Sequence, residues 1–272
     1  QGFAIVGGAG KLLGGAVNID GGLQPDGAMR FAAQGTASAD GLRRSSDFGG
    51  PALARLAASL SGQTTYRVAL NLVNGKPDLL LTSNLVGLAS ELPPPLRKAA
   101  EVALPLRLQT AAVSDVPPTA AARDFIRLDL GSVLQAHYVR DVSGISPRVL
   151  RGGIGVMEPA PTPAAGVAAA INMPSLNLGD WQRLLDGLPV LPGVASAGEA
   201  HATASARTGY LPTTLGVRAQ EVLMGARRLD QVVAKVALEG PLWRVNLESE
   251  QASGTIEYRA PRLVAAPSPA TR

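Results

Sequence analysis

The chain combines many turn-forming residues with an apolar composition, and this combination limits the folds open to it. Its 272 residues include 31 Gly and 21 Pro, while 46% are hydrophobic. A chain this apolar can bury a sizeable core and lacks the composition of a disordered protein. Because Gly and Pro interrupt helices and strands, their frequency predicts many short strands joined by turns.

The clearest predicted hairpin lies between residues 66 and 82. In Tyr66–Leu72 apolar and polar positions alternate with the period of a strand, and Asn74-Gly75 is a typical hairpin turn. Further alternating strands are predicted at residues 16–20, 28–37, 125–130, 135–140, 148–156, 167–173, 213–219, 228–239, 242–249 and 254–258. Strands do not alternate with helices, so the sequence predicts a mainly β, antiparallel series rather than a doubly wound sheet.

Three short helices interrupt the predicted strands, at residues 51–60, 96–103 and 178–187. In the last, Asp180 is placed to cap the helix, with Trp181, Leu184 and Leu185 facing inward. The Pro-rich stretch 158–163 suggests a division into segments 1–157 and 158–260. Residues 261–272, rich in Ala, Pro and Ser, predict a flexible tail.

Known catalytic motifs are missing from the sequence. The glycines of Val6–Leu12 fail both nucleotide-loop patterns, because Leu12 follows the Lys and Leu13 replaces a required Gly. No G-x-S-x-G elbow is present. His137 and His201 are the only histidines, too few for a His-based zinc site. We therefore expect no catalytic residue, metal site or cofactor.

Charge and cysteine content restrict the partners and the compartment. The net charge of +4 is scattered along the chain, and aromatic residues make up only 4%, so we expect no nucleic-acid partner. The sequence has no Cys, which rules out disulfides and fits a periplasmic protein. No apolar run approaches the roughly 20 residues that span a bilayer. Since the chain begins at Gln1, we expect a mature or excised piece.

Several stretches together resemble the YhdP proteins, which belong to the AsmA-like group of Gram-negative bacteria. The most specific is Leu80–Lys98 with its Leu-Pro-Pro-Pro-Leu core. Weaker similarities complete the resemblance over roughly residues 10–260: Gly62–Tyr66, Trp181 with Leu184 and Leu185, Leu229–Val232, Trp243–Leu247 and Ala252–Tyr258.

The resemblance implies a long, curved β-sheet whose open apolar groove crosses the periplasm. It implies phospholipid or another acyl-chain ligand, transport between inner and outer membrane, and outer-membrane biogenesis as the context. It also implies that the full-length protein is anchored in the inner membrane by an N-terminal helix absent here. Partners would be the rest of its own longer chain and other envelope proteins.

Three functional hypotheses remain open from the sequence. The first is a lipid groove, whose predicted lining residues are Val68, Leu70, Leu72, Leu79, Leu81, Ile126, Leu128, Leu130, Val245 and Leu247. The second is a non-catalytic structural or protein-interaction module of the cell envelope. The third is a carbohydrate-active enzyme with paired carboxylates, for which Trp181 and Trp243 would be sugar platforms. A one-residue error in strand register would exchange the two faces of the sheet.

Overall fold

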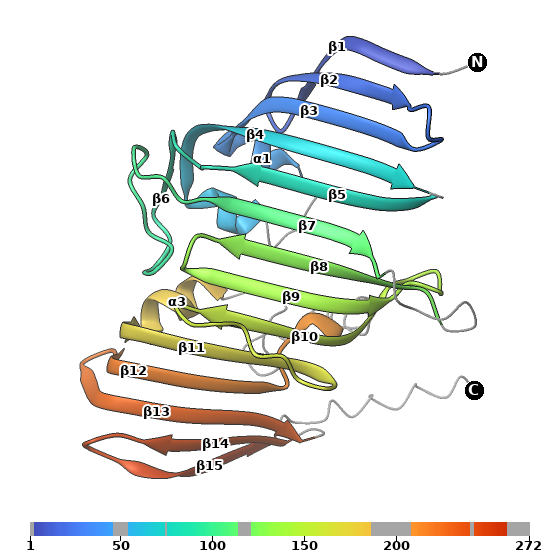
Figure 1. Ribbon diagram of the computed structural model, residues 1–272. Coiled ribbons are helices and arrows are strands. Elements are labelled where there is room, and N and C mark those ends of the chain that lie inside the picture. The colour runs from blue at the N-terminus through green and yellow to red at the C-terminus, as the bar shows by residue number, and fades with distance from the viewer. Residues whose placement is uncertain are drawn as a thin grey trace, which may run out of the picture.

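A single open, curved sheet forms almost the entire structure (Figure 1). This computed structural model describes residues 3–45, 54–73, 75–113, 121–185, 208–239 and 242–259. Strands β1 to β5 and then β7 to β15 are hydrogen-bonded in chain order, and the short β6 pairs with β4. The prediction of a mainly β, open curved sheet is confirmed.

The strands have the following bounds. The first seven are β1 (Ala4–Leu12), β2 (Gly15–Leu23), β3 (Met29–Ser38), β4 (Leu60–Val73), β5 (Lys76–Ser83), β6 (Leu88–Ser90) and β7 (Leu106–Ala112). The other eight are β8 (Arg123–Leu130), β9 (Leu134–Asp141), β10 (Arg148–Val156), β11 (Gly166–Asn177), β12 (Thr214–Met224), β13 (Arg227–Glu239), β14 (Leu242–Glu248) and β15 (Ser253–Arg259).

Local turn chemistry explains most of the antiparallel pairings. Between β2 and β3, Gly27 adopts a φ of 79°, and Asp26 accepts a hydrogen bond from the backbone N–H of Ala28 at 3.0 Å. A glycine tolerates this left-handed conformation without steric cost. The predicted hairpin joins β4 to β5, with Val68 opposite Leu81 and Leu70 opposite Leu79.

Two pairings are parallel, which corrects the expectation of a wholly antiparallel sheet. Strand β11 runs parallel to both neighbours, β10 and β12. A parallel neighbour requires the chain to return along the sheet before it pairs again. After β10, the Pro-rich segment 158–163 makes this return against one sheet face. There the backbone of Pro161 comes within 1.8 Å of where a Cβ on Gly153 would stand.

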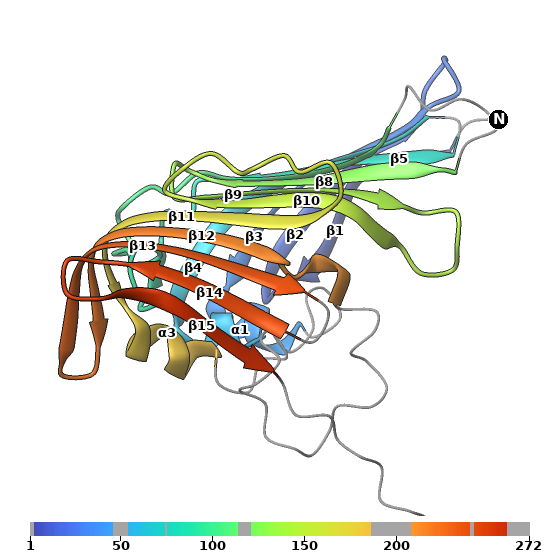
Figure 2. The same ribbon diagram turned by 90° about the horizontal axis from the view of Figure 1, so that it is seen from below.

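The helices lie at strand ends on the concave side of the sheet (Figure 2). Helix α1 (Ala39–Arg44) follows β3, with the Ser38 hydroxyl accepting a hydrogen bond from the Gly41 N–H at 3.0 Å. The sequence analysis did not predict this helix, although Ser38 is a typical N-cap residue. Of the helix predicted at 51–60, residues 54–58 are helical and 51–53 lie outside the described residues.

Helix α3 (Leu178–Leu185) confirms most of the helix predicted at 178–187, whose last two residues lie outside the described range. The prediction that Asp180 caps it is wrong. The Asn177 carboxamide oxygen accepts hydrogen bonds from the N–H groups of Gly179 and Asp180, at 3.0 and 3.4 Å. Asp180 instead pairs with Arg183 one turn along the helix. A single 3-10 turn, η1 (Thr208–Tyr210), precedes β12.

The helix predicted at 96–103 is absent. The backbone groups of this stretch pair with β6: Ser90 and Lys98 exchange two N–H···O hydrogen bonds of 2.8 and 3.0 Å, and Gly87 donates to the Ala100 carbonyl at 2.7 Å. A helix would have to break all three of these bonds and would leave some of the same groups without a partner. The segment is therefore held as an extended loop against β6.

The sheet runs unbroken through the predicted division of the chain. Strands β10 and β11 pair directly, so segments 1–157 and 158–260 contribute to the same sheet. The predicted flexible tail, 261–272, lies outside the described residues. Among the described residues, the buried apolar side chains are mostly Ala and Val, and one cluster of them, Ala219, Val222 and Val232, lies on β12 and β13.

Candidate functional site

One face of the sheet carries apolar side chains from strand to strand. Directly paired residues point to the same face, so the register connects side chains into rows that cross the strands. The central row consists of Ala33, Val68, Leu81, Leu108, Leu128, Ala136, Ile154, Ala169, Leu215, Val236, Val245 and Ile256. We call the face that carries this row the apolar face.

All ten residues predicted to line a groove lie on the apolar face. Four belong to the central row. A neighbouring row contains Leu70, Leu79 and Ile126, and Leu72 extends the same face on β4. On the other side, a row runs through Leu106, Leu130, Leu134, Val156, Ile171, Val217, Ala234 and Leu247. That these residues contact a ligand stays a prediction.

The apolar face is the concave face. The Tyr210 ring, in η1, packs edge-on against the Tyr138 ring with centroids 5.3 Å apart. Tyr138 is paired with Ile126, so its side chain belongs to the apolar face. Figure 2 shows η1 as the short orange coil beneath the sheet, within its curve.

The apolar face is only partly covered. All ten predicted residues are half-buried. Every described strand belongs to the same sheet, so no second described sheet packs against this face as it would in a sandwich. Large aliphatic side chains that a globular core would bury therefore keep an accessible surface.

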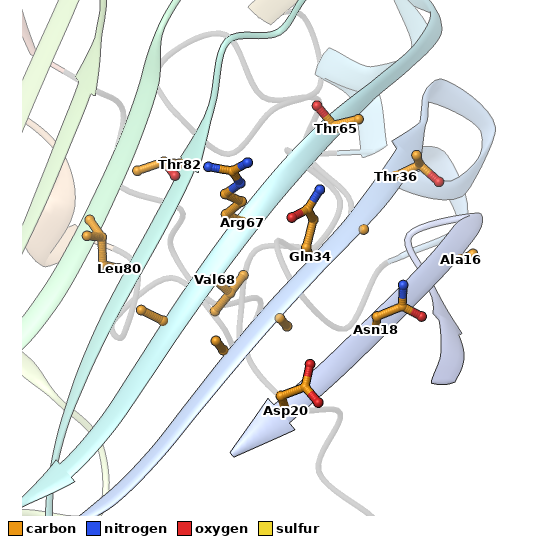
Figure 3. A pocket seen from close by; sticks show the side chains of 14 residues that line it. Ala16, Asn18, Asp20, Gln34, Thr36, Thr65, Arg67, Val68, Leu80 and Thr82 are labelled. Atoms are coloured by element: carbon orange, nitrogen blue, oxygen red, sulfur yellow. The ribbon is translucent and has the colours of Figure 1, made fainter. Parts of the chain in front are cut away.

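The opposite face carries most of the polar side chains of β2 to β9, together with a few apolar ones such as Leu80 and Phe125. One of its rows contains Asn18, Gln34, Arg67, Thr82, Arg107, Asp129 and Gln135. Over β2 to β5 this face has an open hollow of about 740 Å³, and Figure 3 shows Asn18, Gln34 and Arg67 projecting from successive strands into it. Amide, hydroxyl and guanidinium groups suit hydrogen-bonded polar ligands, not hydrocarbon.

A polar cluster ends the apolar face near η1. The Arg140 guanidinium donates two hydrogen bonds to the Asp124 carboxylate, at 2.8 and 2.5 Å, and a third to the Tyr210 hydroxyl at 3.0 Å. Both members of the ion pair are 17% exposed. The Tyr138 hydroxyl donates to the Tyr210 carbonyl at 3.2 Å. This cluster fixes η1 to β8 and β9, and the sequence analysis did not identify it.

Burial, and then the neighbouring Tyr210, raises the pKa of Tyr138 from 10.0 to about 12. Between these values the unfolded chain loses the phenolic proton while the folded chain retains it. We therefore expect stability to fall as pH rises from 10 to 12, by about 2 kcal/mol after allowance for residual solvent exposure. Urea unfolding should show that the free energy of unfolding declines less steeply with pH in Tyr138→Phe than in the wild type. An equal decline in both proteins would contradict the assignment of this pH dependence to Tyr138.

The described residues hold no group of three or more His, Cys, Asp or Glu side chains that could bind a metal ion. His137 lies on the polar face beneath the 158–163 segment, where a Cβ on Gly153 would meet both its ring and Pro161. Burial, then Arg127 and Arg151, lower the pKa of His137, which favours the neutral ring. His201 lies outside the described residues.

Comparison with known proteins gives one match. The family model described as "YhdP protein" matches residues 4–266 of the chain. Neither a curated protein nor a solved structure matches it. Within the described residues, no helix is long and apolar enough to cross a membrane.

Proposed function

The chain belongs to the YhdP family, and from that premise we propose that its concave apolar face binds the acyl chains of phospholipids. The observation that carries this proposal is the continuous row of apolar side chains from β3 to β15, most of which are half-buried. Hydrocarbon needs contiguous apolar surface and no polar motif. Each methylene removed from water contributes about 0.8 kcal/mol, so a long acyl chain on such a surface gains enough to be held.

The proposed role is non-catalytic conduction. Lipid would move along the apolar face, in a segment of a periplasmic groove that links the inner and outer membranes. The rows support this because they run across the strands, parallel to the long direction of the sheet, without a charged interruption in the central row. The remainder of a longer chain and other envelope proteins would extend the groove at both sheet edges.

A protein-interaction module is the second candidate, and the edge strand β15 favours it. Its outer edge is unpaired within the described chain, and Ile256 and Tyr258 are 59% and 46% exposed. An exposed strand edge is a template for pairing with another chain. This role is compatible with a groove, since an extended groove also requires edge pairing.

Photo-crosslinking from matched positions tests the groove. A photoreactive residue at Leu128 or Val245 should crosslink to lipid in cells, and native mass spectrometry should show lipid bound to the purified protein. The same residue at Gln109 or Asn246, on the polar face, should give no lipid adduct. Equal crosslinking from both faces, or no lipid from any position, would reject the proposal.

A further inference from the structure

Three arginines far apart in sequence surround one cavity at the end of the sheet where β4 and β7 begin. The cavity has a volume of about 450 Å³ and lies between the 54–58 helix, the 91–97 loop and α3. Its lining includes Arg55, Glu91, Arg97, Asp180, Arg183 and Leu184. Three guanidinium groups therefore face two carboxylates across a shared space.

Backbone hydrogen bonds build two walls of this cavity. The Glu91 N–H donates to the Ser59 carbonyl at 2.9 Å, which fastens the 91–97 loop to the end of the 54–58 helix. The paired backbones of Ser90 and Lys98 close the loop at its base. Leu92 is buried beneath it at 8% exposure. Arg97 is thus presented from a fixed loop.

Helix α3 forms the third wall and carries Arg183, whose guanidinium is only partly paired. Arg183 pairs with Asp180 on its own helix, yet its side chain is 78% exposed. Arg97 has no ion pair or side-chain hydrogen bond within the described part of the chain. A planar guanidinium with free N–H groups is suited to bidentate contact with phosphate oxygens.

The cavity lies at the end of the sheet that the apolar face also reaches. Strands β7 and β9 begin at this end, with Leu106 and Leu134, and both residues belong to one apolar row. Strand β11 ends here at Asn177, directly before α3. Figure 1 shows α3 and β6 at this same end of the strands. An amphipathic molecule with its chains on the apolar face could place a polar head beside the arginines.

We propose that this arginine-lined cavity binds the phosphate of a lipid headgroup at one end of the groove, an inference that rests on the proposed function. The guanidinium groups of Arg97 and Arg183 contact the phosphate oxygens, and Arg55 lines the same cavity. Asp180 orients Arg183, and the charge of Arg97 is left for the phosphate. The site thereby selects lipids with a phosphate over neutral lipids with the same chains.

Calorimetric titration of the full chain with three probes tests this assignment. Dihexanoylphosphatidic acid carries both chains and phosphate, dihexanoylglycerol carries the chains alone, and inorganic phosphate carries neither chain. The wild type should bind the phosphatidic acid about tenfold or more tighter than the glycerol, because charge-assisted hydrogen bonds favour the former. The Arg97→Gln/Arg183→Gln variant should lose this preference and bind dihexanoylglycerol unchanged.

Arg148→Gln is the matched control, because Arg148 is also an exposed partner of an aspartate but lies at the opposite strand ends. It should behave as the wild type. Equal affinity of the wild type for both lipids, or equal effects of both variants, would overturn the headgroup site while leaving the acyl-chain proposal standing. If inorganic phosphate bound and neither lipid did, and the double variant lost this binding, both proposals would be overturned and the cavity would be a site for free phosphate.

Discussion

Leu108→Arg is expected to abolish acyl-chain binding, whereas Gln109→Arg, one residue along the same strand, should leave it intact. Leu108 lies between Leu81 and Leu128 in the central apolar row. An acyl chain over this position would have to desolvate the new guanidinium, which costs several kcal/mol without a partner. The amount of lipid retained per protein, measured by mass spectrometry, should fall by about 100-fold or more.

The matched pair separates the effect of charge from the effect of position. Gln109 lies between Leu80 and Arg127 on the polar face, so an added arginine there stays in water. Both variants should fold, because Leu108 is half-buried and, when no lipid covers this face, the guanidinium of a long arginine stays in water. Val245→Arg and Asn246→Arg repeat the comparison on β14. Similar lipid loss from both members of a pair would contradict an apolar conduit.

The strand faces were predictable because alternation is local information. In Tyr66–Leu72 the sequence itself distinguishes the two faces, and a hairpin turn fixes the pairing with Leu79 and Leu81. Once the alternation shows which residues of each strand share a face, the pairing of neighbouring strands assigns that face across the whole sheet. The register therefore puts Leu128 and Val245, which are far apart in sequence, on the same face of the sheet.

The features that were missed depend on contacts between distant segments. The direction of β11 is set by where segment 158–163 packs, which alternation does not encode. The stretch at 96–103 has a helical composition, but its backbone partners are on β6. The arginine cavity requires Arg97 and Arg183 to meet through tertiary structure. Neither residue stands out in a sequence whose charges are scattered.

Gly153→Ala should destabilise the protein by about 2 kcal/mol or more, because its Cβ would overlap the returning segment. The ideal Cβ lies 1.8 Å from the Pro161 carbonyl oxygen and 2.7 Å from the His137 ring. The 158–163 segment must then move off the polar face, which removes the support for the parallel pairing of β10 and β11. Urea unfolding measures the loss, and hydrogen exchange should be faster at the β11 amides.

Gly216→Ala is the control for this prediction, since a Cβ there would have nothing within 4 Å. Gly216 pairs with Ala170, which pairs with Gly155, so it occupies the same face two strands away. Replacing it should be neutral or slightly stabilising, because the unfolded chain loses conformational freedom. Equal destabilisation at both positions would show that backbone freedom in the strand, not space for the returning segment, requires the glycine. If only Gly153→Ala loses stability, the absence of a side chain at Gly153 is what allows the 158–163 segment to pack on the polar face. That packing lets β11 run parallel to β10, and the parallel pairing keeps the apolar face continuous across these strands.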